Sequence, residues 1–225
     1  MMPPRFARTD AMQFLLVLLL FLAGASAALA SESHDCFSRN NDRRIDACSR
    51  LIETPGLPTD MLSSAYAMRA LAYSLRGQYE IAIRDYDKAI ELVPNYPMAL
   101  NNRAWAYFRW GKPTQGLPDV EKSLALDPTS EHAYDTRAHI RQWLGNAEAA
   151  IADYEAAMRL GGRVMIKTYQ CGLQAQRLYH GPIDGRYSRA LGSAMIACVE
   201  RGPECDPLPQ GEALPPDEEC YVASS

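Results

Sequence analysis

Residues 63–96, SSAYAMRALAYSLRGQYEIAIRDYDKAIELVPNY, are followed by two segments that align with them at a shift of 34 residues each. The second segment covers 97–130 (PMALNNRAWAYFRWGKPTQGLPDVEKSLALDPTS), and the third covers 131–162 (EHAYDTRAHIRQWLGNAEAAIADYEAAMRLGG). The columns that are identical in all three segments include an arginine (Arg69, Arg103, Arg137), an alanine (Ala70, Ala104, Ala138), a glycine (Gly77, Gly111, Gly145) and an aspartate (Asp85, Asp119, Asp153). A period of this length indicates a repeat architecture.

Each column has a physical role in a pair of helices. The small alanine lets two helices approach closely, and the glycine ends the first helix of each unit because it adopts a positive φ at no steric cost. Pro94, Pro128 and Gly162 then stop the second helix of each unit. The sequence therefore predicts three helix hairpins over residues 63–162.

This pattern resembles the tetratricopeptide repeat. The resemblance implies an all-α fold, a tetratricopeptide helix-hairpin solenoid that binds proteins or peptides along a concave wall built from the first helix of each repeat. The middle copy departs from the pattern, with Gly116 and Ser123 where alanines are usual and with Pro113 and Pro118 near the start of its second helix. We expect that helix to start late or to be less stable.

The repeated arginine and aspartate predict a structural ion pair rather than a ligand clamp. Two arrangements fit the sequence equally: a pair within each unit, such as Arg69 with Asp85, or a pair between Asp85 and Arg103 of the next unit.

The family's geometry places a candidate peptide-binding groove on the first helices. An aromatic wall that also carries amides suits an extended peptide or a partner's helix, although Trp105 and Phe108 are equally suited to packing between helices. Of the dicarboxylate clamp found in some members of the family, only Asn102 has a match. The expected wall residues are Ala67, Met68, Leu71, Asn101, Asn102, Trp105, Phe108, His132, Asp135 and His139.

His132, Asp135 and His139 fall on one helical face, which raises the question of a metal site. Ligands on adjacent turns are three or four residues apart, and a separation of seven is long for two imidazoles on one ion. We expect neither a metal nor a cofactor.

Residues 31–62 read as a degenerate first repeat. Extending the register backwards places Cys36 in the column of Ala70 and Cys48 in the column of Ala82, two positions that face each other across a hairpin. We predict a disulfide between them, which would contribute on the order of 3 kcal/mol.

Residues 163–206 lose the period and read as a helix, a loop with glycine, proline and aspartate, and a second helix. Tyr169, Gln170 and Leu173, the loop and Ala194 resemble the small three-helix peptidoglycan-binding domain, although Ser188, Leu191 and Cys198 depart from it. The resemblance implies a wall-binding-like loop, in which we expect Asp184 to hold the turn shut rather than to catalyse. Its residues are Tyr179, Gly181, Pro182, Ile183, Asp184, Gly185 and Tyr187.

Cys171, Cys198, Cys205 and Cys220 form a second group of cysteines, for which three connectivities remain open. None has the spacing of a metal or redox motif. Residues 207–225 are a tail rich in proline and acidic side chains, which we expect to be extended or disordered away from the cysteines.

Residues 1–30 predict a secretory signal peptide. Arg5 and Arg8 precede the apolar run FLLVLLLFLAG, and Ala28 and Ala30 fit a cleavage site after Ala30. The apolar run is shorter than a membrane-spanning helix needs, so we expect no span after cleavage. A periplasmic or secreted location follows, and the six cysteines suit an oxidising compartment.

The sequence favours a binding function over catalysis. The 225 residues carry 23 Lys and Arg against 27 Asp and Glu, without the basic cluster that nucleic acid requires. No nucleophile, metal-binding or phosphate-binding motif is present. We expect a non-catalytic scaffold for a protein or peptide, held at peptidoglycan by its C-terminal module. The alternative is a structural protein whose C-terminal helices only cap the solenoid; a cell-wall enzyme is third.

Overall fold

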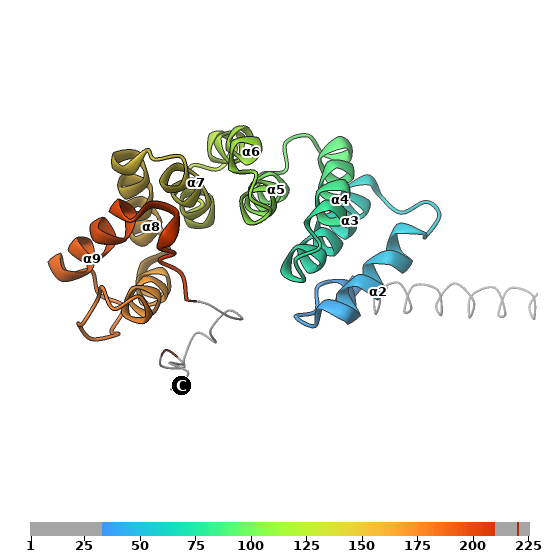
Figure 1. Ribbon diagram of the computed structural model, residues 1–225. Coiled ribbons are helices and arrows are strands. Elements are labelled where there is room, and N and C mark those ends of the chain that lie inside the picture. The colour runs from blue at the N-terminus through green and yellow to red at the C-terminus, as the bar shows by residue number, and fades with distance from the viewer. Residues whose placement is uncertain (1–32, 210–219, 221–225) are drawn as a thin grey trace, which may run out of the picture. The chain divides into compact units, whose positions relative to one another are not determined.

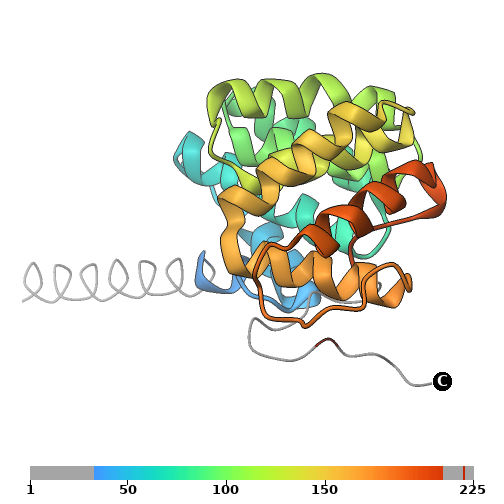
Figure 2. The ribbon, with the colours of Figure 1, turned by 90° about the vertical axis from the view of Figure 1, so that its left-hand side faces the viewer.

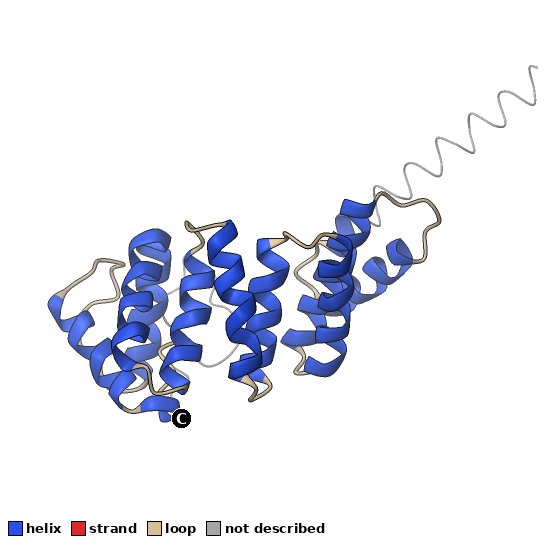
Figure 3. Ribbon diagram, turned by 90° about the horizontal axis from the view of Figure 1, so that it is seen from above, coloured by secondary structure: helices blue, strands red, loops and turns tan. Residues whose placement is uncertain are grey.

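The computed structural model describes residues 33–209 and Cys220, and every regular element in this part of the chain is a helix (Figures 1 and 3). The predicted signal peptide and most of the predicted tail lie outside the described residues. The chain forms two compact units, the first ending at Val93 and the second beginning at Pro94. None of the helices in residues 33–209 combines the length and the apolar character needed to cross a bilayer.

The first unit contains α2 (Asn41–Ile52), α3 (Thr59–Leu75) and α4 (Tyr79–Leu92). The side chain of Asn40 caps α2 by accepting a hydrogen bond from the backbone N–H of Arg43, while Gly77, with φ 72°, forms the turn from α3 to α4. The core between α2 and α3 is small, and its buried members are Cys36, Ala47, Cys48, Leu51, Ala65 and Met68.

The second unit begins with two hairpins (Figure 1). The first pairs α5 (Pro97–Arg109) with α6 (Pro113–Leu126), and the other pairs α7 (Glu131–Trp143) with α8 (Ala147–Ala175). Gly111 and Gly145 have φ of 75° and 80° at the turns, as the repeated glycine column predicts. The all-α fold class with its helix hairpins is therefore confirmed, and the first hairpin begins at Thr59, before residue 63, at which the sequence predicts the start of the repeats.

Helix α8 is interrupted at Gly162, whose φ of 56° and ψ of −141° are not helical. Figure 2 shows α8 changing direction along its length. The third repeat thus ends at the glycine where the sequence predicts its end, and the second half of α8 belongs to the C-terminal region. That region continues with α9 (Arg189–Glu200) and the short 3₁₀ helix η1 (Gly202–Glu204).

The repeated ion pair lies within each repeat and joins its two helices. Each arginine uses Nε and an Nη to bind both carboxylate oxygens of the aspartate sixteen positions later, at distances from 2.7 to 2.9 Å. The pairs are Arg69 with Asp85, Arg103 with Asp119, and Arg137 with Asp153. The structure therefore selects the first of the two arrangements that the sequence allows.

Helix α6 does not start late, so that part of the expectation is wrong, while its lower stability stays a prediction. It begins at Pro113, the same position in the repeat as Tyr79 at the start of α4. Proline is accepted at the first helical position because its missing N–H has no partner there in any helix. Pro118 lies inside α6, where it removes one backbone hydrogen bond without ending the helix.

The serine of the middle repeat has a local explanation. In the first repeat, Ser63 on α3 donates its hydroxyl to the carbonyl of Ala89 on α4 at 2.8 Å. In the middle repeat these two columns hold Pro97 and Ser123, and the hydroxyl of Ser123 donates to the carbonyl of Pro97 at 2.9 Å. The same two columns are linked in both repeats, but the donor has moved from the first helix to the second.

Gly116 marks the close approach of α6 to α5. A Cβ atom at this position would lie 2.6 Å from the carbonyl oxygen of Ala104. Alanine therefore does not fit here, although the corresponding positions of the other repeats hold Ala82 and Ala150.

The C-terminal helices share a core with the third repeat. Tyr154 and Met158 from the first half of α8 belong to one buried cluster with Tyr169 from its second half and with Leu191 and Met195 from α9. The third repeat and the C-terminal region are therefore one packed body.

Candidate functional site

In the first unit, the structure divides the expected groove residues. Met68 is 6% exposed and belongs to the core beside the disulfide, whereas Leu71 is partly exposed. Met68 therefore contributes to packing within its unit.

In the second unit, α5 carries the expected amides and aromatic rings. Asn101 is buried and donates its Nδ2 to Oδ1 of Asn102 at 3.2 Å. Asn102, Trp105 and Phe108 are half-buried, and the ring centroids of Trp105 and Phe108 lie 5.2 Å apart. Arg109 lies over the ring of Trp105 at 5.7 Å. The aromatic pair is therefore partly packed and partly open to solvent.

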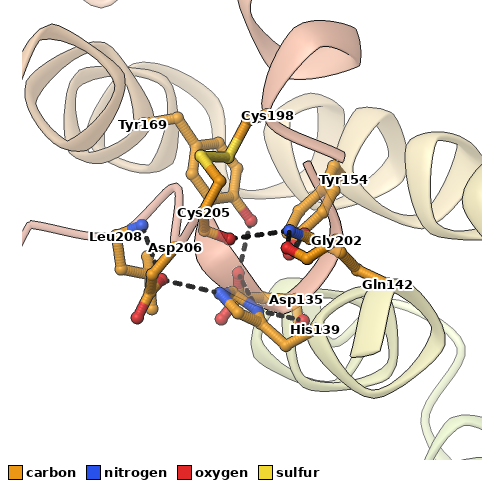
Figure 4. Close-up of polar contacts among 10 residues, drawn as sticks. All are labelled: Asp135, His139, Gln142, Tyr154, Tyr169, Cys198, Gly202, Cys205, Asp206 and Leu208. Carbon is orange, nitrogen blue, oxygen red and sulfur yellow. Dashed lines mark hydrogen bonds and ion pairs between the residues drawn. A yellow bond between two sulfur atoms is a disulfide. The ribbon is translucent and has the colours of Figure 1, made fainter. Parts of the chain in front are cut away.

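On α7, the structure differs from the expectation of an open wall. His139 is only 3% exposed, because the rings of Trp105, Phe108 and Tyr154 surround it at centroid distances of 5.3, 5.6 and 5.2 Å. Residues 202–208, which we call the C-terminal strap, cover the remaining side (Figure 4).

Both ring nitrogens of His139 face oxygen atoms. Nδ1 lies 2.8 Å from the carbonyl oxygen of Asp135, and Nε2 lies 3.2 Å from Oδ1 of Asp206 in the strap. The same Oδ1 accepts the backbone N–H of Leu208 at 3.0 Å. A carbonyl and a carboxylate only accept hydrogen bonds, so a ring that donates to both is an imidazolium.

The pKa values of the pair shift in the directions that this geometry requires. Burial lowers the pKa of His139, but Asp135 and Asp206 outweigh it, so the pKa is raised above its usual value. Burial raises the pKa of Asp206, but the hydrogen bond and the charge of His139 outweigh it, so the pKa is lowered. Both shifts therefore favour the charged forms, the imidazolium of His139 and the carboxylate of Asp206.

Asp135, which was also expected on the wall, is buried beneath this pair. Its Oδ1 accepts a hydrogen bond of 2.5 Å from the hydroxyl of Tyr169 on the second half of α8. Burial raises the pKa of Tyr169 well above its usual value, and the charge of Asp135 adds to the effect. Asp135 therefore connects α7 with α8 and is not available to a ligand.

Gln142 completes the network, and Figure 4 shows its contacts with the strap. Its Nε2 donates to two backbone carbonyls of the strap, that of Gly202 at 2.8 Å and that of Cys205 at 2.7 Å. Its Oε1 accepts the hydroxyl of Tyr154 at 2.7 Å. Both polar atoms of this amide are thus engaged inside the protein.

A small cavity of about 80 Å³ remains where the strap meets α5 and α7. Helices α5 and α7 and the strap all contribute to its lining, which consists of Phe108, His139, Gln142, Trp143, Pro203, Cys205 and Asp206. This volume holds little more than a few water molecules.

His132 does not join His139 and Asp135. Its side chain is 74% exposed, and its Nε2 lies 3.8 Å from a carboxylate oxygen of the neighbouring Glu131. Within residues 33–209 and Cys220, no cluster of His, Cys, Asp and Glu side chains has an arrangement that could hold a metal ion.

The wall-binding-like loop closes around the buried Gln170. The Nε2 of Gln170 donates to Oδ1 of Asp184 and to the carbonyl of Arg186, both at 3.1 Å, and its Oε1 accepts the N–H of Gly185 at 2.9 Å. Asp184 also accepts the N–H of Arg186 at 2.9 Å, which is the largest cause of its lowered pKa. Asp184 thus has a structural position in the turn.

Other loop residues support the same turn. The hydroxyl of Tyr179, which is buried, donates to the carbonyl of Pro182 at 3.0 Å, and Gly181 packs against the Tyr179 ring. Gly185 has φ 69°, and a Cβ there would lie 2.8 Å from the carbonyl oxygen of Arg163. Glycine is therefore required both for the conformation and for the close approach to α8.

Tyr187 differs from the rest of the loop because it is 53% exposed. It lies at an open hollow of about 390 Å³ that spans the break in α8, with Glu155, Met158 and Arg159 before the break and Ile166 after it. Burial and the neighbouring Glu155 raise the pKa of the Tyr187 hydroxyl.

The structure pairs all six cysteines. Cys36 is bonded to Cys48, the pair that the register of the degenerate repeat predicts. Of the three connectivities left open for the others, the structure has Cys198 with Cys205 and Cys171 with Cys220. The Cys198–Cys205 bond ties the strap to the end of α9.

Sequence reasoning missed the role of Gln142, Tyr154 and Asp206. Gln142 shares a repeat column with Ser74 and Phe108, so no pattern identifies it, and Asp206 lies outside the repeats altogether. Only the folded chain brings these residues together.

Comparison with known proteins agrees with the fold. Residues 70–111 match the model of the TPR repeat. The chain is similar to a solved structure named MamA RS-1 ArsTM double mutant, with a TM-score of 0.53 and 17% identity over 77% of this chain and 93% of the other. At this identity the likeness shows the fold alone.

Curated relatives are much longer than the segments that they share with this chain. The human mitochondrial import receptor subunit TOM70 is 27% identical over 176 residues, which are 74% of this chain and 28% of the relative. The Hsp70-Hsp90 organizing protein 2 of Arabidopsis thaliana is 32% identical over 81 residues, 36% of this chain and 14% of the relative. The similarity thus supports a tetratricopeptide-repeat protein.

Proposed function

We propose that this protein is a non-catalytic scaffold that binds a protein or peptide through the exposed face of α5. The observation that carries the proposal is the half-buried surface of Asn102, Trp105 and Phe108, which presents an amide and two rings to solvent on the first helix of a repeat. Aromatic rings and amides are the side chains with which such surfaces bind extended peptides or helices. The relatives named as an import receptor and a chaperone-organizing protein support a protein as the partner.

The test places a photo-crosslinking amino acid at Asn102 or at Trp105 and exposes the purified protein to the exported fraction of the source organism. We expect the same crosslinked partner from both positions. The matched control is Glu121, an exposed residue on α6. Equal crosslinking from Glu121, or none from the two α5 positions, would contradict the proposal.

The proposed location is the periplasm or the exterior of the cell. Its support is the sequence of residues 1–30 together with six cysteines that all form disulfides in the structure. Cell fractionation of the tagged full-length chain checks this proposal, and a protein retained in the cytoplasm with free thiols would contradict it.

Attachment to peptidoglycan is a second proposal, with Tyr187 and the adjacent hollow as the binding surface. Its support is the exposed ring of Tyr187 beside Arg159 and the apolar side chain of Ile166, a combination suited to sugar rings and carboxylates. The alternative is that the C-terminal helices only cap the repeats, and the core that they share with the third repeat supports this alternative.

Sedimentation with purified sacculi separates the two. Wall binding predicts that the protein pellets with sacculi and that Tyr187→Ala reduces the pelleted fraction several-fold, whereas Tyr66→Ala, in the other unit, leaves it unchanged. A protein that stays in the supernatant would leave capping as the role of the C-terminal helices.

A further inference from the structure

The contacts between α7 and the C-terminal strap have the form of peptide recognition. Gln142 binds two backbone carbonyls of the strap, and His139 binds the carboxylate of Asp206. A side-chain amide that binds main-chain oxygens and a cation that binds an acidic side chain are the means by which a groove holds an extended acidic segment. The strap therefore stands where a peptide ligand of the third repeat would stand.

We propose that residues 202–208 are a built-in peptide ligand, which occupies the α7 part of the binding face while His139 and Asp206 form an ion pair and leaves α5 to the partner. The proposal rests on the proposed function, because it leaves the exposed face of α5 as the surface that binds the partner. It adds that the site on α7 binds an extended peptide that contains an aspartate. It concerns contacts inside the second unit only.

His139 is the group whose charge decides whether the strap is held. The pKa of Asp206 is lowered and burial raises the pKa values of Tyr154 and Tyr169 well above the usual value, so these groups keep their charge states near neutral pH. The groups that face the pair are Asp135 on α7, Asp206 on the strap, Tyr154 and Tyr169 on the two halves of α8, and Arg109, which acts on Asp206 from α5.

When His139 loses a proton, it should lose its hydrogen bond to Asp206 in the strap and keep its hydrogen bond to Asp135 on α7. Nδ1 keeps its hydrogen because it donates to the carbonyl of Asp135, so the proton is lost from Nε2. The lone pair of Nε2 would then face Oδ1 of Asp206, and two acceptors repel each other. The strap stays tethered by Cys198–Cys205, so the expected change is an undocking of residues 206–208 without release of the chain.

The first readout is the NMR titration of the four histidines in the non-reduced protein. We expect His139, assigned with a His139→Gln variant, to titrate at a higher pH in the parent protein than in Asp206→Asn, because the charge of Asp206 raises the pKa of His139 and the amide carries no charge.

The second readout is the hydrogen exchange of the strap amides, corrected for the intrinsic effect of pH. In the parent protein, exchange at Leu208, whose N–H donates to Oδ1 of Asp206, should accelerate by at least about tenfold when His139 loses its proton, since the charge-assisted hydrogen bond that holds Asp206 is lost. His139→Gln should show the fast exchange at all pH values, and His132→Gln should behave like the parent.

A fourth variant should loosen the strap while both residues of the ion pair are kept. A Cβ at Gly172, on the second half of α8, would run into the backbone of Pro207 and Leu208, so Gly172→Ala should displace the strap and accelerate its exchange. Circular dichroism of each variant establishes that the helices are intact.

The ligand class is tested with a synthetic peptide of residues 202–209 that carries Cys205→Ser. We expect it to bind the Asp206→Asn protein at least about tenfold more tightly than the parent, whose site is filled, and we expect a peptide with Asp206→Asn to bind neither. Three outcomes would each overturn the proposal: titration of His139 at the same pH in the parent and in Asp206→Asn, strap exchange that is unchanged by substitution of His139 and of Gly172, or failure of the peptide to bind. These readouts need no partner protein, and so their failure is distinct from failure of the crosslinking test at α5.

Discussion

At the scale of single residues, the three repeated ion pairs differ in their surroundings. Arg103 donates hydrogen bonds to both carboxylate oxygens of Asp119. Asp153 accepts hydrogen bonds from Arg137 and also from Arg141, whose Nη1 lies 2.7 Å from Oδ2 of Asp153. A buried carboxylate that loses its partner destabilises a protein more than one that keeps a second partner.

We therefore expect Arg103→Met to lower the free energy of unfolding by about 2 kcal/mol and Arg137→Met to lower it by about 1 kcal/mol. Both variants lie in the second unit, so each serves as the control for the other in urea unfolding. Equal losses would mean that Arg141 gives Asp153 no support.

The stability of the second unit should depend on pH through His139. Its pKa is raised in the folded protein, so its contribution is complete below the unfolded pKa of about 6.5 and is lost as the pH rises through the folded pKa. Asp206 has a lowered folded pKa, so its contribution is present above the unfolded value of about 3.9 and is lost as the pH falls through the folded pKa.

The difference in unfolding free energy between the parent and His139→Gln should thus be largest between about pH 4 and 6.5 and should decrease on either side. Thermal unfolding at a series of pH values measures it, with His132→Gln as the reference. A difference that grows at alkaline pH would contradict the assigned charges.

At the scale of elements, the middle repeat keeps a hydrogen bond between its two helices, but the serine that donates it lies on the second helix instead of the first. Ser63 on α3 and Ser123 on α6 occupy opposite columns, and each donates to a carbonyl on the other helix of its hairpin.

Ser123→Ala should cost about 1 kcal/mol, because it leaves the carbonyl of Pro97 without this donor. Adding Pro97→Ser to Ser123→Ala recreates the pair found in the first repeat and should recover much of the loss. Urea unfolding of the single and double variants measures both effects, and a double variant no more stable than the single one would refute the exchange of donors.

Gly116→Ala should destabilise the α5–α6 hairpin by about 2 kcal/mol, even though alanine fills this column in the other repeats. The added methyl group would collide with the backbone of Ala104, which cannot move away as a flexible side chain can. Chemical denaturation measures the loss, with Gln115→Ala, an exposed position on the same turn, as the control. A stabilised Gly116→Ala protein would show that the two helices separate at no cost.

At the scale of the whole molecule, the first unit should depend on its disulfide where α2 packs on α3. The core between these two helices contains few large apolar side chains, and Cys36 and Cys48 are themselves fully buried members of it. Replacing both by serine should cost about 3 kcal/mol and should accelerate the hydrogen exchange of α2, with α7 as the internal reference. Unchanged exchange in α2 would show that the apolar contacts suffice.

The sequence predicts the hairpins because small residues, turn glycines and paired charges recur in fixed columns, and each of these has a local physical cause. The start of α6 was predicted wrongly because proline at the first position of a helix and proline inside one look alike in sequence until the helix start is known. The strap could not be predicted, because Gln142 and Asp206 lie 64 residues apart and belong to no shared period.

The strap has a consequence for the order in which the protein is made. Ribosomes synthesise the chain from the N-terminus, so α7 and its partner helices emerge before Asp206 does. A newly made third repeat therefore passes through a stage in which His139 and Gln142 are uncovered, and a chaperone or a ligand that meets the nascent protein encounters a surface that the finished molecule hides.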